Sequence, residues 1–405
     1  MPAVARLGLT RRHCLALFTT IPAQAVAAES WPARKVSSSE PLRQLCPGGP
    51  SGLLGIGASG SLWALPLTSG APRRLALGSD ADTPLATGHG RIAARAADGA
   101  LWVWNGEREQ RSAAALLAPH AGLLSLPLAV IGIADNKGAA QVVRLEADSS
   151  NRWLEVARSA EPVLPDARPI QVDLDGSSDG GHVLVLAGPD AQRYDHGVLG
   201  DAIEATRIVW LERHGLTPMR ELSLPAPFVF EDIAPRVVAL ARGTGLLTLR
   251  SGPAGAQLVL VTADAGNSAR QQIAASGEAL GLRHRWMAPT SDGTRLLAVH
   301  TPHIGGVLHE YRRQGDQLIG RAVARDLSTH RIRTRELDLA VWLGPKLVVP
   351  SQDGSRLRVL DAARDYAEIA GASLPSRVAM TVALPGTQGM AALLDDGRVL
   401  SWPLP

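Results

Sequence analysis

The fold is decided by the stretch RIAARAADGALWVW, residues 91–104. In it, a mainly apolar run over 91–97 meets the turn Asp98-Gly99, and a second apolar run follows over 101–104. Asp-Gly between two apolar runs is a strong local signal for a β-hairpin, because both residues tolerate the positive φ angles of a tight turn. The stretch therefore predicts two adjacent antiparallel strands.

The same strand–turn–strand unit recurs along the chain. The turn glycines that mark it are Gly60, Gly99, Gly138, Gly255, Gly306, Gly354 and Gly397. Successive glycines are separated by 39, 39, 117, 51, 48 and 43 residues, and the longest gap has room for two units, one of them with an insertion. A repeat of about 40–50 residues built from strands is typical of a β-propeller blade. We therefore predict an all-β fold, a β-propeller of eight four-stranded blades, with seven blades as the alternative.

The last unit predicts how the ring closes. Each hairpin supplies the two middle strands of a blade, with the inner strand before it and the outer strand after it. The eighth unit ends at Pro405, directly after its third strand. We expect the segment around residues 31–37 to supply the missing outer strand, because that pairing would remove an exposed sheet edge. Residues 28–405 are then a single propeller domain.

Residues 1–27 have the features of an export signal. The segment TRRHCL at 10–15 resembles the twin-arginine motif, with Cys14 in place of its Phe and Ala16 in place of its Lys. An apolar stretch follows, and then a small-residue cleavage site at 25–27. We expect an exported, periplasmic protein with the signal peptide removed, and the general export route is the alternative to the twin-arginine route.

Cleavage of the signal changes what the composition implies. The formal net charge is +3, and residues 1–27 hold Arg6, Arg11 and Arg12 but no acid, so the mature chain is close to neutral. This balance gives no case for nucleic-acid binding. Cleavage also leaves Cys46 as the sole cysteine, which excludes an intrachain disulfide. No run after the signal approaches the roughly 18 apolar residues of a membrane-spanning helix.

The repeats resemble the broad propeller group that includes WD40, YVTN and FG-GAP/VCBS repeat proteins, over about residues 40–405. The likeness is architectural, because the Gly-His and Trp-Asp pairs of WD40 blades and the YVTN tetrapeptide are absent. One local match, residues 173–180, is similar to the Asp-x-Asp core of an FG-GAP/VCBS repeat. Alternate oxygens at that spacing can wrap Ca²⁺, so Asp173, Asp175 and Asp179 are candidate calcium ligands. An Asp/Ser/Gly-rich turn is the alternative, since no bidentate Glu follows at the twelfth position.

Loops of the fourth to seventh units form the candidate binding face. In a propeller, the loops between second and third strands lie on the same face as the connections from one blade to the next. Loops on a rigid scaffold are where binding residues normally lie. The candidate ligand-binding residues in these loops are His196, Asp201, Glu204, Arg207, Glu231, Asp232, Arg236, His284, Arg285, His303, Arg333, Arg335, Glu336, Asp338, Gln352 and Asp353.

These residue types leave two functions open. The arginines are suited to clamp a carboxylate or phosphate, which favours a non-catalytic module that binds an anionic small molecule or a periplasmic protein. Pairing of the same arginines with neighbouring acids, which would only fix the loops, is the alternative. The second function is that of a metal-dependent enzyme with its site on the same face. His300 and His303, as candidate ligands of a transition metal, favour this alternative. The sequence contains no Gly-x-Ser-x-Gly, Cys-x-x-Cys-His or His-Glu-x-x-His motif.

Overall fold

The computed structural model describes most of the chain. The described residues are 29–48, 52–67, 70–76, 78–136, 138–173, 181–264, 267–337, 339–384, 386 and 389–405. The predicted export signal lies outside them, as do Asp175, Asp179 and Asp338. Besides strands, these residues form the short 3-10 helices η1 (Gly197–Leu199) and η2 (Ala362–Arg364). None of the helices found there is long and apolar enough to cross a membrane.

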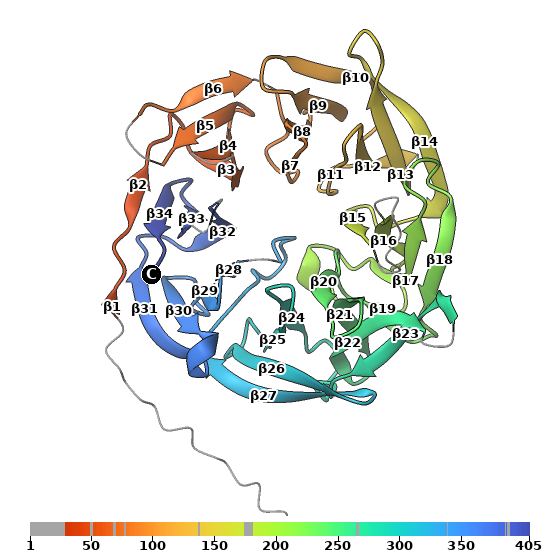
Figure 1. Ribbon diagram of the computed structural model, residues 1–405, viewed down its shortest axis with the longest axis vertical. Coiled ribbons are helices and arrows are strands. Elements are labelled where there is room, and N and C mark those ends of the chain that lie inside the picture. Colours follow the sequence, from red (N-terminus) through yellow and green to blue (C-terminus); the bar gives the residue numbers. More distant parts are fainter. Residues whose placement is uncertain are drawn as a thin grey trace, which may run out of the picture.

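The strands form sheets that stand side by side around a central axis, which is the arrangement of a β-propeller (Figure 1). Antiparallel pairing among the described residues divides most of the strands into eight sets of four. Each set, called a blade below, runs from an inner strand near the centre of the ring to an outer strand at its rim. The all-β propeller predicted from the sequence is confirmed.

The first blade consists of β3 (Leu42–Pro47), β4 (Gly52–Gly57), β5 (Leu62–Pro66) and β6 (Arg73–Ala76), and the second of β7 (Ala86–Gly88), β8 (Arg91–Arg95), β9 (Ala100–Trp104) and β10 (Glu109–Ala115). The third blade consists of β11 (Leu124–Ser125), β12 (Ala129–Asn136), β13 (Ala139–Ala147) and β14 (Trp153–Pro162). The fourth consists of β15 (Ile170–Val172), β16 (His182–Asp190), β17 (Glu204–Leu211) and β18 (Pro218–Ser223).

The fifth blade consists of β20 (Arg236–Ala239), β21 (Thr244–Gly252), β22 (Gly255–Asp264) and β23 (Asn267–Ser276), and the sixth of β24 (Met287–Thr290), β25 (Leu296–His300), β26 (Val307–Gln314) and β27 (Gln317–Arg325). The seventh blade consists of β28 (Val341–Leu343), β29 (Lys346–Pro350), β30 (Arg356–Asp361) and β31 (Ala367–Ser373). The eighth consists of β32 (Val378–Ala383), β33 (Gly389–Leu394), β34 (Val399–Pro403) and β2 (Arg34–Val36). In addition, β1 (Glu29–Ser30) pairs in parallel with β31, and β19 (Val229–Phe230) bridges β17 and β21.

The middle hairpins lie where the turn glycines predict them. Gly99 joins β8 to β9 with φ of 89°, and Gly397 joins β33 to β34 with φ of 80°. These angles are strained for any residue with a Cβ atom, which explains the recurring glycine. At Gly60, between β4 and β5, a Cβ would also lie 2.5 Å from the carbonyl oxygen of Ser79. Glycine therefore recurs in the sequence because the backbone of these turns requires it.

The core lies between neighbouring blades, where the faces of their sheets meet. The large side chains there include Trp102, Trp210 and Trp402, each at most 1% exposed. Burial of such large apolar surfaces is the main favourable contribution to folding, because the transfer of apolar area out of water is favourable. The loops above this core are therefore carried on a rigid ring.

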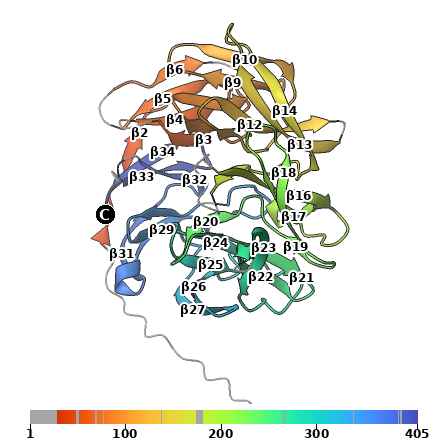
Figure 2. The ribbon, with the colours of Figure 1, turned by 45° about the vertical axis from the view of Figure 1, so that its right-hand side comes forward.

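The N-terminal strand closes the ring, as predicted. Strand β2 pairs antiparallel with β34, with Lys35 opposite Leu400, and supplies the outer strand of the eighth blade (Figure 2). Just before β2, the indole nitrogen of Trp31 donates a hydrogen bond to the carbonyl oxygen of Pro403 (3.1 Å), and its ring lies 5.6 Å from that of Trp402. The eighth blade thus combines three strands from the C-terminal part of the chain, β32 to β34, with one strand from its N-terminal part, β2.

Candidate functional site

The connection from β27 to β28 extends over the centre of the ring (Figure 1). We call its residues 328–337 the crossing loop. At one end of the loop, Arg335 Nε lies 2.6 Å from Asp166 Oδ2, and Arg335 Nη2 lies 2.7 Å from Asp201 Oδ2. At the other end, Arg331 Nη1 lies 2.5 Å from Asp395 Oδ1. Asp166 and Asp201 belong to the fourth-blade side of the ring and Asp395 to the eighth blade, so the loop links segments on opposite sides of the ring.

A buried histidine sets the shape of the crossing loop. His330 is 2% exposed, and its Nε2 donates a hydrogen bond to the carbonyl oxygen of Thr334 at 2.8 Å. Its Nδ1 is then the acceptor for His303 Nε2, at 3.0 Å. Burial lowers the pKa of His330 to about 3, so the ring is neutral at ordinary pH and both bonds are satisfied. The rings of both histidines also pack against Trp286.

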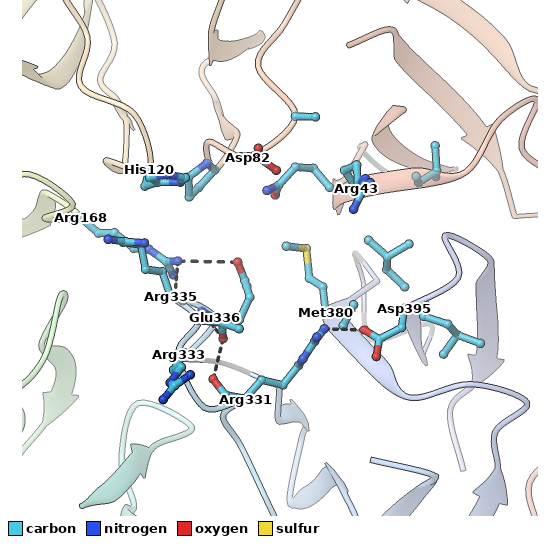
Figure 3. Close-up of a pocket in the computed structure, with 18 residues that line it drawn as sticks. Arg43, Asp82, His120, Arg168, Arg331, Arg333, Arg335, Glu336, Met380 and Asp395 are labelled. Atoms are coloured by element: carbon cyan, nitrogen blue, oxygen red, sulfur yellow. Dashed lines mark hydrogen bonds and ion pairs between the residues drawn. The ribbon is translucent and has the colours of Figure 1, made fainter. Parts of the chain in front are cut away.

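A cavity of about 520 Å³ lies beside the crossing loop at the centre of the face, and we call it the central pocket (Figure 3). It is bordered by β3, by the connections that enter the second, third and fourth blades, by the crossing loop and by the turn after β33. The charged residues of its wall are Arg43, Asp82, Arg168, Arg331, Arg333, Arg335, Glu336 and Asp395. Arginines therefore outnumber acids in this wall.

Three of these arginines are already used within the protein. Arg331 and Arg335 hold the ends of the crossing loop, and Arg168 Nη2 donates to the carbonyl oxygen of Arg335 at 2.5 Å and lies 3.8 Å from Glu336 Oε1. By contrast, the side chains of Arg43 and Arg333 are exposed and form neither an ion pair nor a hydrogen bond with any other described residue. The guanidinium groups of these two residues are free to bind an anionic group in the pocket.

Several predicted site residues meet at this pocket or support it. Arg333, Arg335 and Glu336 line it, and Asp201 holds Arg335 in place. His303 and Gln352 line a neighbouring cavity of about 300 Å³, together with Asp353. This second cavity shares Arg331 and Asp395 with the central pocket. For Asp338 the prediction stays untested, since that residue lies outside the described chain.

Other predicted residues form a network that runs from the exposed His284 and the half-buried His196 to the buried Glu231. His196 Nδ1 lies 2.5 Å from Glu231 Oε1, and Ser251 donates to the other oxygen of this fully buried carboxylate. The ring of His284 stacks on that of His196 at 5.0 Å. The chain after His196 forms η1, and the carbonyl oxygen of Val198 in η1 accepts a hydrogen bond from the backbone nitrogen of Arg333 in the crossing loop (2.8 Å).

Two predicted arginines pair with acids, Arg236 at the start of β20 and Arg207 within β17 rather than in the predicted loop. Arg236 Nη1 lies 2.9 Å from Asp232 Oδ2, which also accepts from Thr248. Arg207 bridges Glu161 at 2.8 Å and Glu221 at 3.0 Å. Arg285 lies half-buried in the connection before β24, and Glu204 is buried in β17. None of these residues lines the central pocket.

The predicted metal ligands have separate partners. His300 stacks on His309 with ring centres 3.6 Å apart and lies 2.5 Å from the hydroxyl of Tyr311, whereas His303 contacts His330. Within the part of the chain that the structure describes, no group of three or more His, Cys, Asp or Glu residues is arranged to hold a metal ion. The calcium loop stays a prediction, because of its three ligands only Asp173 is described.

Sequence reasoning missed part of the pocket wall. Arg43, Asp82, His120 and Arg168 come from the first four blades and their connections, where the loops carry few polar residues. A signal was present in their positions, because each stands in an inner strand or in a blade-to-blade connection. The prediction considered only the longer, more polar loops of the fourth to seventh units and therefore omitted these four residues.

No family model matches the chain, and neither does any curated protein sequence. Solved structures with the same fold include Sqt1 of Saccharomyces cerevisiae, with a TM-score of 0.62 and 10% identity over 93% of this chain and 100% of that chain. They also include BamB of Moraxella catarrhalis, with a TM-score of 0.54 and 13% identity over 92% of this chain and 97% of that chain. At such low identity the likeness shows the β-propeller fold and nothing finer.

Proposed function

We propose that this protein is a non-catalytic binding propeller, and that an acidic segment of a protein partner docks in the central pocket. The observation that carries the proposal is the pair Arg43 and Arg333, two exposed arginines that line the pocket and form no ion pair with any described residue. Arginine binds carboxylates through two parallel charge-assisted hydrogen bonds, so an Asp or Glu side chain is the matching group.

The chemistry of the wall favours binding over proton transfer. A guanidinium group stays protonated at all ordinary pH values and has no acceptor, so it cannot serve as a general base. The pocket volume of about 520 Å³ suits a few side chains of a partner rather than a folded domain. The export signal predicted from residues 1–27 would place that partner in the periplasm.

Fluorescence anisotropy tests this proposal with a labelled peptide of sequence Gly-Ser-Glu-Glu-Asp-Ala-Gly-Ser. We expect Arg333→Ala to weaken binding about tenfold or more, because a hydrogen bond between charged groups is worth about 1.5–3 kcal/mol. Arg43→Ala should act in the same direction, and binding should weaken as salt is raised.

The matched control is Arg364→Ala. The side chain of Arg364 at η2 is 72% exposed and lies outside the central pocket, so its substitution should leave the affinity unchanged. Equal binding of the peptide in which Lys replaces the three acids, or an unchanged affinity in both pocket variants, would contradict the proposal.

A further inference from the structure

A third cavity adjoins the central pocket on the side of the third and fourth blades. Its volume is about 430 Å³, and both cavities are lined by His120 and Arg335. The two spaces therefore share a wall, and Arg335 in that wall is fixed by Asp166 and Asp201. We call this space the proline cavity.

The proline cavity has an apolar surface. Its wall is built mainly from Pro119, Pro162, Pro165, Pro189, Val163 and Ile203, with small residues between them. A proline has no backbone N–H, so the four prolines add no hydrogen-bond donor to the wall. Three of the prolines, Pro119, Pro162 and Pro189, are exposed, so the apolar surface is accessible to a side chain of a binding partner.

The acids of the proline cavity already have partners. Asp166 binds the guanidinium group of Arg335, and Asp135 Oδ1 accepts a hydrogen bond from the backbone nitrogen of Gly138 at 2.8 Å. The cavity therefore offers area for an apolar group, and the charge that faces an incoming anion lies next door in the central pocket. An occupant that matches both spaces has an apolar side chain beside a carboxylate.

We infer that the partner segment carries an apolar side chain next to its acidic residues, and that this side chain enters the proline cavity while a carboxylate binds in the central pocket. The inference rests on the proposed function, because it assigns the central pocket to the same acidic segment. It adds a requirement that the arginines alone do not impose. Burial of the apolar group removes from water both its own surface and the exposed proline rings.

Two labelled peptides that differ at one position test this requirement by fluorescence anisotropy. They are Gly-Ser-Glu-Glu-Asp-Leu-Gly-Ser and the same peptide with Ala in place of Leu. We expect the Leu peptide to bind about tenfold or more tightly, because full burial of a leucine side chain is worth about 1.5–3 kcal/mol. The charge of the two peptides is the same, so the ratio reports the apolar contact alone.

A variant that fills the proline cavity provides the second arm. Ala139 lies exposed in its wall at the start of β13, and Ala139→Trp should lower the affinity for the Leu peptide to that for the Ala peptide. Pro162→Glu, at another exposed wall position, should do the same by placing a charge where the apolar group lies. The matched control is Ala363→Trp at η2, which should change neither affinity.

The outcomes separate the inference from the proposed function. If both peptides bind equally and depend on Arg333, and neither Ala139→Trp nor Pro162→Glu changes binding, the apolar requirement is wrong and the acidic docking site stands. If neither acidic peptide binds, the inference falls together with the proposed function. Thermal melts of the two cavity variants check that each remains folded, and a reduced Leu-to-Ala ratio in either folded variant supports the inference.

Discussion

Glu204 is a carboxyl group that lies where an ionised side chain is poorly stabilised. It is 2% exposed in β17, and its Oε1 atom has no hydrogen-bond partner among the described residues. Burial raises the pKa of Glu204 well above its ordinary value of 4.5, and the nearby carboxylate of Glu231 adds to the rise. The folded protein therefore holds a proton on this side chain at pH values where the unfolded chain has lost it.

This raised pKa predicts that the contribution of Glu204 to stability falls as the pH rises. Above the ordinary glutamate pKa this group binds fewer protons in the unfolded state than in the folded state, so its contribution to the free energy of unfolding falls by about 1.4 kcal/mol per pH unit until the folded pKa is reached. Glu204→Gln keeps the shape and removes the titration. We expect this variant to be more stable than the parent at pH 8, by about 1 kcal/mol or more, with a flatter pH dependence in urea unfolding.

The control for this prediction is Glu221→Gln, at a carboxylate that is 56% exposed on β18 and paired with Arg207. Its effect should stay within about 0.5 kcal/mol, because exposed ion pairs contribute little. If Glu204→Gln were less stable than the parent at pH 8 and as steep in its pH dependence, Glu204 would have to be ionised in the folded state.

Strand β2 shows how much one short element contributes to the fold. It is three residues long, yet it is preceded by Trp31, which is 6% exposed and contacts Trp402 and Pro403. We expect Trp31→Ala to lower the free energy of unfolding by about 3 kcal/mol, because removal of a buried tryptophan leaves a cavity between the seventh and eighth blades. Urea unfolding followed by circular dichroism measures this loss.

Lys35→Ala provides the comparison on the same element. Lys35 is exposed on β2, and its substitution should change stability by less than about 0.5 kcal/mol. A similar small effect for Trp31→Ala would mean that the eighth blade holds together without its contribution from the N-terminal segment.

The elements that sequence predicts well are those with local causes. The hairpin at Asp98-Gly99 needs only a turn glycine and two apolar runs, so its strands β8 and β9 follow from a few neighbouring residues. The closure by β2 followed from counting strands per blade. The path of the crossing loop has no such local cause, because it depends on Arg335 meeting Asp166, a residue 169 positions away in the chain. The residue types of the site were therefore predictable, and their convergence with Arg43 was not.

At the scale of the whole molecule, the crossing loop joins segments that the ring keeps apart. Its Arg335 contacts Asp166 and Asp201 near the fourth blade, and its Arg331 contacts Asp395 in the eighth. We expect the double variant Arg331→Ala/Arg335→Ala to speed backbone hydrogen exchange about tenfold in both the segment 197–203 and the turn 394–398. The reason is that each contact restrains a loop that opens locally. Exchange followed by mass spectrometry measures both segments at once.

The single variants resolve the two ends of the loop. Arg335→Ala should affect mainly the segment 197–203, and Arg331→Ala mainly the turn 394–398, with Arg364→Ala as the surface control. Unchanged exchange in both segments of the double variant would show that the ion pairs of the crossing loop do not restrain them.

The pairing of β2 with β34 also has a consequence for how the protein is made. The ribosome synthesises β2 more than 360 residues before β34, so the strand that completes the eighth blade stays unpaired until β34 has been made. During that interval the growing chain is an open arc with two unpaired sheet edges, the kind of surface that chaperones cover. Closure of the ring therefore cannot precede the synthesis of residues 399–403, and premature termination before residue 399 yields a chain that lacks the partner of β2.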